Sequence, residues 1–406
     1  MAAVSPARRA AYEVLLRVFE QEAYADRAFR SAAEGLDERE RAFAQRLAYG
    51  SVQRVRTLDH AIDTLGRRPV RKLDPPVRAA LRLGAYQLGY TDTAPHAAVN
   101  ESVELVRRAP LERAVAFTNA VMRRLSDGIR PLLASLPDGP LKESYPDWIH
   151  VTFVRAFGED AALALMRAMN EPLETVVRLV RGEPPVGAEK TDLPSAYRVE
   201  RVGEAQVTAG RIWPQSRGSQ LAGLCVGSRE GERVLDLCAA PGGKTGQLRG
   251  EVTAVEIDPA RARELRENLA TMRRSDVAVV EADGTALPPE LDGFDRALVD
   301  APCSGLGVLA QRPDLRWRAK PLPDLQLALL RSAAERVRAG GTIVYSVCTL
   351  NPDECEAVVD ASGLDVLPLG EAWPSFAHPS RPEFLLTLPH VHGTSGFFVA
   401  RLRSPG

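Results

Sequence analysis

Residues 232–245 read ERVLDLCAAPGGKT, a short apolar run followed by a turn with one proline and two glycines. The apolar run is typical of a buried strand, and the polar end of the stretch is typical of the start of a helix. Glycine lets a ligand approach the backbone closely, and the first turn of a helix offers unpaired amide donors. The stretch therefore predicts a nucleotide-like ligand at the point where a first strand turns into a first helix.

Further apolar runs rich in valine, isoleucine and leucine follow this stretch. They are EVTAVEID (251–258), DVAVVEAD (276–283), FDRALVDAP (294–302) and GGTIVYSVCT (340–349). Helix-like stretches separate most of them, namely KTGQLRG (244–250), PARARELRENLATMRR (259–274) and PDLQLALLRSAAERVRAG (323–340). This alternation predicts a doubly wound, Rossmann-like α/β domain over residues 219–406, with its ligand beyond the carboxyl ends of the strands.

Two common phosphate-binding motifs do not fit the glycine-rich turn. The motif GxxxxGKS/T needs a glycine five residues before Gly243, where the chain has Cys238, and GxGxxG is absent. A lone acid at a strand end is more often a turn or helix cap, but Glu256, Asp283 and Asp300 stand at three successive strand ends. Glu256 is placed to accept hydrogen bonds from a ribose diol, and Asp283 from an adenine amino group. S-adenosylmethionine, an adenosyl cofactor without a phosphate chain, fits this pattern best.

The chain has five cysteines and no CxxC pair, which argues against a disulfide framework and a zinc ribbon. We therefore expect a reducing compartment and no metal site. Cys303, in APCSG, and Cys348, in SVCTL, each follow an apolar run and stand in a polar turn, which indicates thiol chemistry beside the cofactor. The other three cysteines are expected to be small core residues: Cys225, Cys238 and Cys355.

Residues 5–127 show apolar positions at helical spacing throughout, which predicts an all-helical domain. Residues 1–127 carry 21 Lys and Arg against 16 Asp and Glu, a net charge of +5, while the rest of the chain carries 31 against 37, a net charge of −6. A basic excess is compatible with a nucleic-acid footprint. An arginine-rich helical surface facing solvent explains it equally well, so charge alone leaves both interpretations open.

Prolines punctuate the next region, in which two helix-like stretches alternate with short strand-like pieces such as TVVRLVRG (175–182). A small mixed α/β unit over residues 129–218 is the expectation. The N-terminus lacks the uncharged apolar core of a signal peptide, and no apolar segment approaches the roughly 20 residues of a membrane span. These features predict a soluble, cytoplasmic protein that does not contact a membrane.

Several longer motifs resemble those of one enzyme family, the RNA cytosine-carbon-5 methyltransferases of the RsmB/Nop/Sun type, and within it the bacterial RsmB group. The matching segments span the chain: PHAAVNESVELVR, RGSQL, VLDLCAAPGGKT, DAPCSGLGVL, QRPDLRW, YSVCTLNPDECEAVV and GFFVARL. The pairing of DAPCS with a later VCT cysteine is close to diagnostic. The resemblance implies a multidomain fold with an all-α NusB-like RNA-binding domain (1–128), a small α/β, RRM-like connecting domain (129–218) and a catalytic domain that binds S-adenosylmethionine (219–406).

Roles for individual residues also follow from the resemblance. Cys348 is expected to add to carbon 6 of cytosine, Asp300 to satisfy the charge that develops on ring nitrogen 3, and Cys303 to assist release of the product. The cofactor-binding residues that it implies are Cys238, Ala239, Ala240, Pro241, Gly242, Gly243, Lys244, Glu256, Asp283 and Asp300.

The substrate implied by the resemblance is 16S ribosomal RNA, at the cytosine conventionally numbered 967, either as RNA or within a small-subunit assembly intermediate, and the protein is expected to act as a monomer. A target base must be flipped out or lie in a loop. Arg312, Arg316 and Trp317 of QRPDLRW are either phosphate and stacking contacts or parts of an ordinary loop. Two alternatives stay open: a different rRNA or tRNA cytosine, and a non-catalytic RNA-binding or assembly factor.

Overall fold

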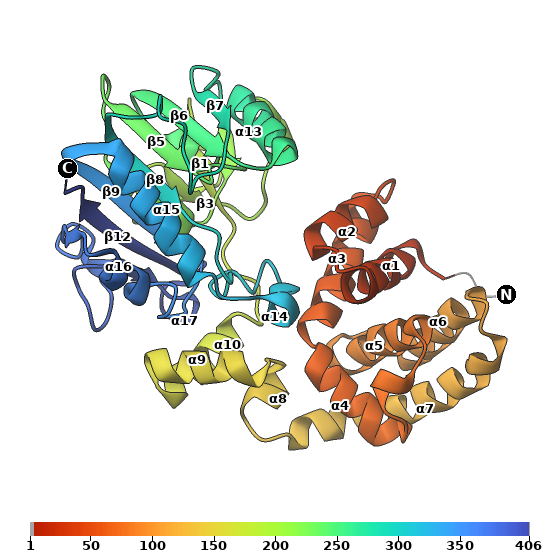
Figure 1. The fold of residues 1–406 in the computed structure, drawn as a ribbon. Coiled ribbons are helices and arrows are strands. Elements are labelled where there is room, and N and C mark those ends of the chain that lie inside the picture. Colours follow the sequence, from red (N-terminus) through yellow and green to blue (C-terminus); the bar gives the residue numbers. More distant parts are fainter. Residues whose placement is uncertain (1–3, 406) are drawn as a thin grey trace. The chain divides into compact units, whose positions relative to one another are not determined.

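The computed structural model describes residues 4–405 and divides them into two compact units. Of the described residues, unit 1 contains 4–154, 159–170 and 311–318, and unit 2 contains 155–158, 171–310 and 319–405. Figure 1 shows unit 1 as helices alone and unit 2 as a sheet with helices packed on it. The predicted domain boundaries at residues 128 and 218 stay predictions.

Unit 1 is helical, as its spacing of apolar residues predicts. Its elements are α1 (Pro6–Glu20), α2 (Ala25–Ala32), α3 (Glu38–Gln53), α4 (Val55–Gly66), η1 (Val70–Lys72), α5 (Pro75–Tyr90), α6 (Pro95–Arg108), α7 (Glu112–Ser135), α8 (Pro140–Glu143), most of α9 (Asp147–Phe157), α10 (Glu159–Ala168) and α14 (Leu315–Arg318). Helix α5 is buried along most of its length and packs against α1, α3, α4, α6 and α7. Close packing at its centre depends on Gly84, because a Cβ there would lie 2.4 Å from Cε of Met122.

Two helix boundaries of unit 1 have clear local causes. The Asp37 side chain accepts a hydrogen bond from the Glu40 amide at 2.9 Å and so caps α3. Pro75 occupies the first turn of α5, where no amide donor is needed. Helix α7 continues through Pro131 to Ser135, although proline lacks the amide donor that a helix interior uses.

Unit 2 contains two sheets. The smaller is antiparallel, with strand order β2-β3-β1-β4, and the larger has the order β10-β12-β9-β8-β5-β6-β7, with β11 paired to β12. The strands are β1 (Val176–Leu179), β2 (Glu189–Lys190), β3 (Ala196–Arg198), β4 (Ile212–Pro214), β5 (Arg233–Leu237), β6 (Glu251–Glu256), β7 (Ala278–Glu281), β8 (Phe294–Asp300), β9 (Val337–Val347), β10 (Asp365–Val366), β11 (Leu385–Thr387) and β12 (Phe397–Arg403). The helices are α11 (Glu204–Thr208), α12 (Arg217–Val226), η2 (Thr245–Gln247), α13 (Pro259–Thr271), α15 (Pro323–Arg336), α16 (Glu356–Ser362), η3 (Pro374–Phe376) and α17 (Pro389–His392).

The five predicted strands form the parallel part of the large sheet, which confirms the doubly wound fold. Strand β5 pairs with β6 on one side and with β8 on the other, so the chain reverses its direction of travel across the sheet at β5. Ligands of such sheets bind at this reversal, beyond the carboxyl ends of the strands. Helix α15 packs on β5, β8 and β9 and crosses the sheet in Figure 1.

The structure differs from the prediction in two places. Only a 3-10 turn, Thr245–Gln247, follows the glycine-rich loop where a helix was expected, so the expected row of helix N-terminal amides is absent there. Strands β10, β11 and β12 form an antiparallel extension beyond β9. Among the described residues, the helices are all too short or too polar to span a membrane.

Candidate active site

The glycine-rich loop leaves β5 with a tight turn that only glycine fits at one point. Gly242 has a φ of +101°, and a Cβ there would lie 2.7 Å from Cδ1 of Leu265. Beneath the loop, the buried Asp236 accepts a hydrogen bond from Thr245 Oγ1 at 2.7 Å. Burial raises the pKa of Asp236 to about 7, against the opposing effect of that hydrogen bond. The loop is therefore fixed from below by a carboxyl group that titrates near neutrality.

A buried arginine holds the loop from its other side. Arg178, on β1, directs its guanidinium at the carbonyl oxygens of Gly243, at 3.3 Å, and Gly246, at 3.5 Å, and its Nε at Oε1 of Gln215, at 3.0 Å. Burial lowers the pKa of Arg178 to about 10. The small sheet therefore contributes directly to the shape of the cofactor loop, a role that the sequence did not indicate.

The acids predicted to bind the adenosine differ in their surroundings. Oε1 of Glu256 accepts a hydrogen bond from the Asp258 amide at 3.1 Å, whereas Oε2 is buried without a hydrogen-bond partner, 3.6 Å from a guanidinium nitrogen of Arg261. A buried acceptor with no donor is costly unless a ligand satisfies it, so this oxygen fits a ribose hydroxyl. Asp283 caps its own turn by accepting from the amide and hydroxyl of Thr285 at 2.8 and 2.7 Å, and the amide bond lowers its pKa. Its predicted contact with adenine stays a prediction.

Asp300 lies at the carboxyl end of β8, where both of its carboxylate oxygens are engaged. Lys244 Nζ lies 2.7 Å from Oδ2, and Ser346 Oγ donates to Oδ1 at 2.6 Å. The register of the sheet accounts for the second contact, because Asp300 pairs with Ser346 across β8 and β9. Lys244, expected to contact the cofactor or the substrate, is thus held by Asp300, and any cofactor contact of Lys244 stays a prediction.

The two thiols predicted for catalysis meet beside this ion pair. Cys303 and Cys348 are partly exposed, and their Sγ atoms lie 3.4 Å apart. A hydrogen bond from the Cys303 thiol lowers the pKa of Cys348, with Lys244 assisting and burial and Asp300 opposing. The same bond, together with burial, raises the pKa of Cys303. The pair therefore favours a thiolate at Cys348 and a protonated thiol at Cys303.

The loops that carry the thiols are pinned by backbone contacts at glycines. The Gly307 amide donates to the carbonyl of Cys348 at 3.0 Å, and the Gly396 amide donates to the carbonyl of Gly307 at 2.8 Å. A Cβ on Gly307 would lie 2.1 Å from the carbonyl oxygen of Gly396. This close approach of three segments fixes the Cys348 backbone relative to the Cys303 loop.

The QRPDLRW tract belongs to unit 1, and its structure overturns part of the RNA-contact hypothesis. Arg316 is completely buried and donates to the carbonyl oxygens of Met169, at 3.0 Å, and Gln53, at 3.3 Å. Its guanidinium lies 3.9 Å from the ring centroid of Tyr145. Trp317 Nε1 donates to the Val52 carbonyl at 2.6 Å. Arg316 and Trp317 therefore stabilise the fold of unit 1, and the interpretation of this tract as a structural loop is the better one.

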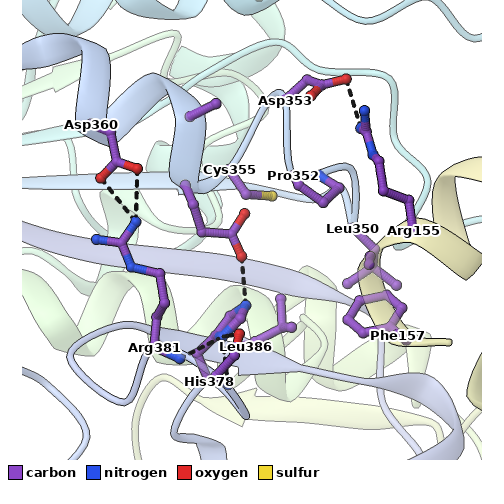
Figure 2. Close-up of a pocket in the computed structure, with 14 residues that line it drawn as sticks. Arg155, Phe157, Leu350, Pro352, Asp353, Cys355, Asp360, His378, Arg381 and Leu386 are labelled. Atoms are coloured by element: carbon purple, nitrogen blue, oxygen red, sulfur yellow. Dashed lines mark hydrogen bonds and ion pairs between the residues drawn. The ribbon is translucent and has the colours of Figure 1, made fainter.

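Unit 2 contains a hollow of about 360 Å³, lined mainly by the loop after β9, helix α16 and residues 378–386. Figure 2 shows the side chains that line it. Its charged side chains pair with one another. Arg155 lies 2.7 Å from Asp353, Arg381 lies 2.8 Å from Asp360, and His378 lies 2.6 Å from Glu356. Because these charged side chains pair with one another, the described residues that line the hollow offer no free charged group for catalysis, and the thiol site is the better candidate for the active site. Residues 4–405 contain no cluster of His, Cys, Asp and Glu side chains that could hold a metal ion.

The chain is similar to known proteins along nearly its whole length. The family model described as 16S rRNA methyltransferase RsmB/F matches residues 224–403, and that of the NusB family matches residues 5–127. A probable ribosomal RNA small subunit methyltransferase B from Synechocystis is 32% identical over 98% of this chain and 99% of its own length. The ribosomal RNA small subunit methyltransferase B of Thermus thermophilus is 34% identical over 80% of this chain and 78% of its own. The solved structure of PH0851 has a TM-score of 0.80, with 23% identity over 99% of both chains, and supports the fold.

Proposed function

Because this chain belongs to the RsmB family of ribosomal RNA small subunit methyltransferases, which use S-adenosylmethionine, we propose that it methylates carbon 5 of a cytosine in 16S ribosomal RNA, at the position conventionally numbered 967. The observation that carries the cytosine-5 assignment is the thiol pair. Cys348 and Cys303 face each other at 3.4 Å beside the Lys244–Asp300 ion pair. Methylation of an amine or a hydroxyl group would need neither thiol.

Carbon 5 of cytosine is too weak a nucleophile to take a methyl group unaided. In the proposed reaction, the Cys348 thiolate adds to carbon 6 and forms a carbon–sulfur bond, which makes the ring an enamine that is nucleophilic at carbon 5. Negative charge develops on nitrogen 3 during addition. Asp300, which accepts a hydrogen bond from Lys244 and so shares a proton with it, is the group proposed to satisfy this charge.

S-adenosylmethionine, when bound, supplies an electrophilic methyl group. Its binding residues are the loop around Gly242, which fits a closely approaching ligand, and Glu256, whose buried Oε2 has no hydrogen-bond partner. Release then requires carbon 5 to lose its proton and the carbon–sulfur bond to Cys348 to break. Cys303, which holds its proton next to Cys348, is placed to protonate the departing thiolate. The Cys303 thiolate formed in this way takes the proton from carbon 5, and the proton left on Cys348 passes to solvent before the next turnover.

Substrate position is tested by reaction with undermodified RNA. Small-subunit RNA from a strain that lacks the modification, both naked and within assembly intermediates, is incubated with the protein and S-adenosylmethionine, and 5-methylcytosine is mapped by bisulfite sequencing. We expect a single modified cytosine at position 967. A modified base elsewhere, in this RNA or in transfer RNA, would refute the position but not the chemistry. Methylation without any 5-methylcytosine would refute the chemistry.

A non-catalytic assembly factor is the second candidate, and the same site argues against it. RNA binding alone would not require a thiol with a lowered pKa beside an ion pair. Binding of the RNA without methyl transfer under the same conditions would support the assembly factor instead.

A further inference from the structure

Glu354 is a carboxylate that is completely buried next to the thiol site. No Lys, Arg or His side chain forms an ion pair with it within the part of the chain that the structure describes. A buried charge without an opposite charge is unfavourable unless hydrogen bonds compensate it. The hydrogen bonds that compensate the buried Glu354 charge therefore indicate its role.

Hydrogen bonds to Glu354 fully occupy its two oxygens. Oε1 accepts from three donors, which are Ser304 N at 2.9 Å, Leu322 N at 3.1 Å and Gln326 Nε2 at 3.0 Å. Oε2 accepts from three more, which are Ser304 Oγ, Thr349 Oγ1 at 3.3 Å and Asn351 Nδ2 at 3.4 Å. Such a set compensates a buried carboxylate without a cation.

The donors come from both of the loops that carry the thiols. Ser304 directly follows Cys303, and Thr349 directly follows Cys348. The two hydroxyl groups also contact each other at 2.8 Å. Leu322 and Gln326, at the start of α15, hold the carboxylate from a third side. Glu354 is thus the common acceptor for the residues next to both thiols.

We propose that Glu354 is a positioning residue that sets the distance between Cys303 and Cys348, so that the Cys303 thiol stays within hydrogen-bond reach of the Cys348 sulfur. This inference rests on the proposed function of the thiol pair. Glu354 contacts neither thiol and positions them through Ser304 and Thr349. Its charge also acts on Cys303 directly, because it adds to the effects of the Cys348 hydrogen bond and of burial in raising the pKa of Cys303. Loss of Glu354 removes the shared acceptor of these donors. The two loops then keep the Gly307–Cys348 backbone bond and the Ser304–Thr349 hydroxyl contact, but their ends that carry the thiols can shift relative to each other.

Loss of Glu354 is expected to change the ionisation and the position of Cys348. When the thiols shift relative to each other, the Cys303 hydrogen bond that lowers the pKa of Cys348 weakens. The other charged groups that face Cys348, Lys244 and Asp300, do not contact Glu354 and keep their places. A larger fraction of Cys348 is then protonated at neutral pH, and its misplacement adds to the loss of rate.

Three variants separate positioning from other roles. Glu354→Ala removes the acceptor. Glu354→Gln keeps the shape and one oxygen, and Ser304 and Thr349 can turn their hydroxyl groups to accept from the new amide, so it preserves part of the network. Glu356→Ala is the matched control, because Glu356 is two residues further on and pairs with His378, at the hollow described above.

The first measurement needs no RNA. Alkylation of Cys348 by iodoacetamide is followed against pH and located by mass spectrometry. We expect the pH curve of Cys348 alkylation to move to higher pH in Glu354→Ala and to move less in Glu354→Gln. The alkylation curve of Glu356→Ala is expected to match that of the wild type. S-adenosylmethionine affinity, measured by calorimetry, is expected to be unchanged in all three, and it reports whether unit 2 is folded.

The second measurement is methyl transfer to small-subunit RNA. Glu354→Ala is expected to be slower than the wild type by about 100-fold, the size of effect typical of a displaced reacting group, with Glu354→Gln in between. Wild-type rates and alkylation curves in both Glu354 variants would overturn the proposal. If Glu354→Ala fails to bind the cofactor, Glu354→Gln carries the test alone. If the wild type methylates no cytosine, the proposed function fails, but the alkylation curves still decide the role of Glu354.

Discussion

The Sγ atoms of Cys303 and Cys348 lie 3.4 Å apart although 45 residues separate them in the chain. They meet because β8 and β9 are parallel neighbours, so that their carboxyl ends lie at the same edge of the sheet. One thiol donates to the other, which lowers the pKa of Cys348 and raises that of Cys303. The proposed roles, Cys348 as the nucleophile and Cys303 as the residue that assists product release, depend on this difference in pKa.

Replacement of Cys303 is expected to change the ionisation of Cys348. A thiol with a lowered pKa is ionised at lower pH, so removal of the donor in Cys303→Ala moves the pH curve of Cys348 alkylation to higher pH. Cys303→Ser keeps a hydroxyl donor and is expected to move it less. Cys225→Ala, in the buried α12, is the control. An unchanged or lowered curve in Cys303→Ala would show that Cys303 does not donate to Cys348.

Replacement of Glu256 is expected to weaken cofactor binding. Its buried Oε2 has no hydrogen-bond partner, so a ligand hydroxyl that donates to it gains a charge-assisted bond worth roughly 1.5–3 kcal/mol. Glu256→Gln is therefore expected to bind S-adenosylmethionine about 10- to 100-fold more weakly by calorimetry. Glu281→Gln, at the exposed end of β7, serves as the control. Equal affinity in the wild type and Glu256→Gln would place the ribose elsewhere.

Asp236 is expected to make stability depend on pH between about 4 and 7. Its folded-state pKa of about 7 lies above that of an exposed aspartate, so the folded protein holds this proton over a range where the unfolded chain has lost it. The free energy of unfolding therefore falls as pH rises through this range, by roughly 2–4 kcal/mol from this group, and then levels off. Asp236→Asn, which stays neutral, is expected to show a shallower fall in urea titrations of the cofactor-free protein at pH 5 and pH 8. If the free energy of unfolding fell by the same amount between pH 5 and pH 8 in both proteins, Asp236 would be excluded as the source of the pH dependence.

Arg316→Ala is expected to destabilise unit 1 and to leave the salt dependence of RNA binding unchanged. The substitution removes a buried guanidinium and leaves the carbonyl oxygens of Gln53 and Met169 without this donor. The expected loss is roughly 2–4 kcal/mol of unfolding free energy. Arg39→Ala, at an exposed position of α3, is expected to change it by less than about 0.5 kcal/mol. A reduced salt dependence of RNA binding in folded Arg316→Ala, with unchanged stability, would restore the phosphate-contact hypothesis.

The sequence predicted the parts of the site that lie at strand ends. Asp300, Cys303 and Cys348 follow apolar runs, and neighbouring parallel strands bring such positions together. Glu354 was not predicted, because an acid in a polar loop gives no sign of burial until the loops fold around it.

Tertiary packing also explains the other differences. The burial of Arg316 depends on residues 311–318 packing with a unit that is distant in sequence. KTGQLRG was predicted to be helix-like, yet the Gln247 side chain donates to the carbonyl oxygen of Gln220 in α12, and the chain turns into β6 after one 3-10 turn. Local propensity cannot anticipate such contacts.

The most direct test of the account is covalent capture of the intermediate. Cys303→Ala protein is incubated with undermodified small-subunit RNA and S-adenosylmethionine and then run on a denaturing gel. Because addition of Cys348 continues while release is impaired, an RNA–protein adduct is expected to accumulate, to map to Cys348 by mass spectrometry, and to disappear in the Cys303→Ala, Cys348→Ala double variant. An adduct that persists in the double variant, or 5-methylcytosine formed by Cys348→Ala protein, would contradict the proposal that Cys348 is the nucleophile.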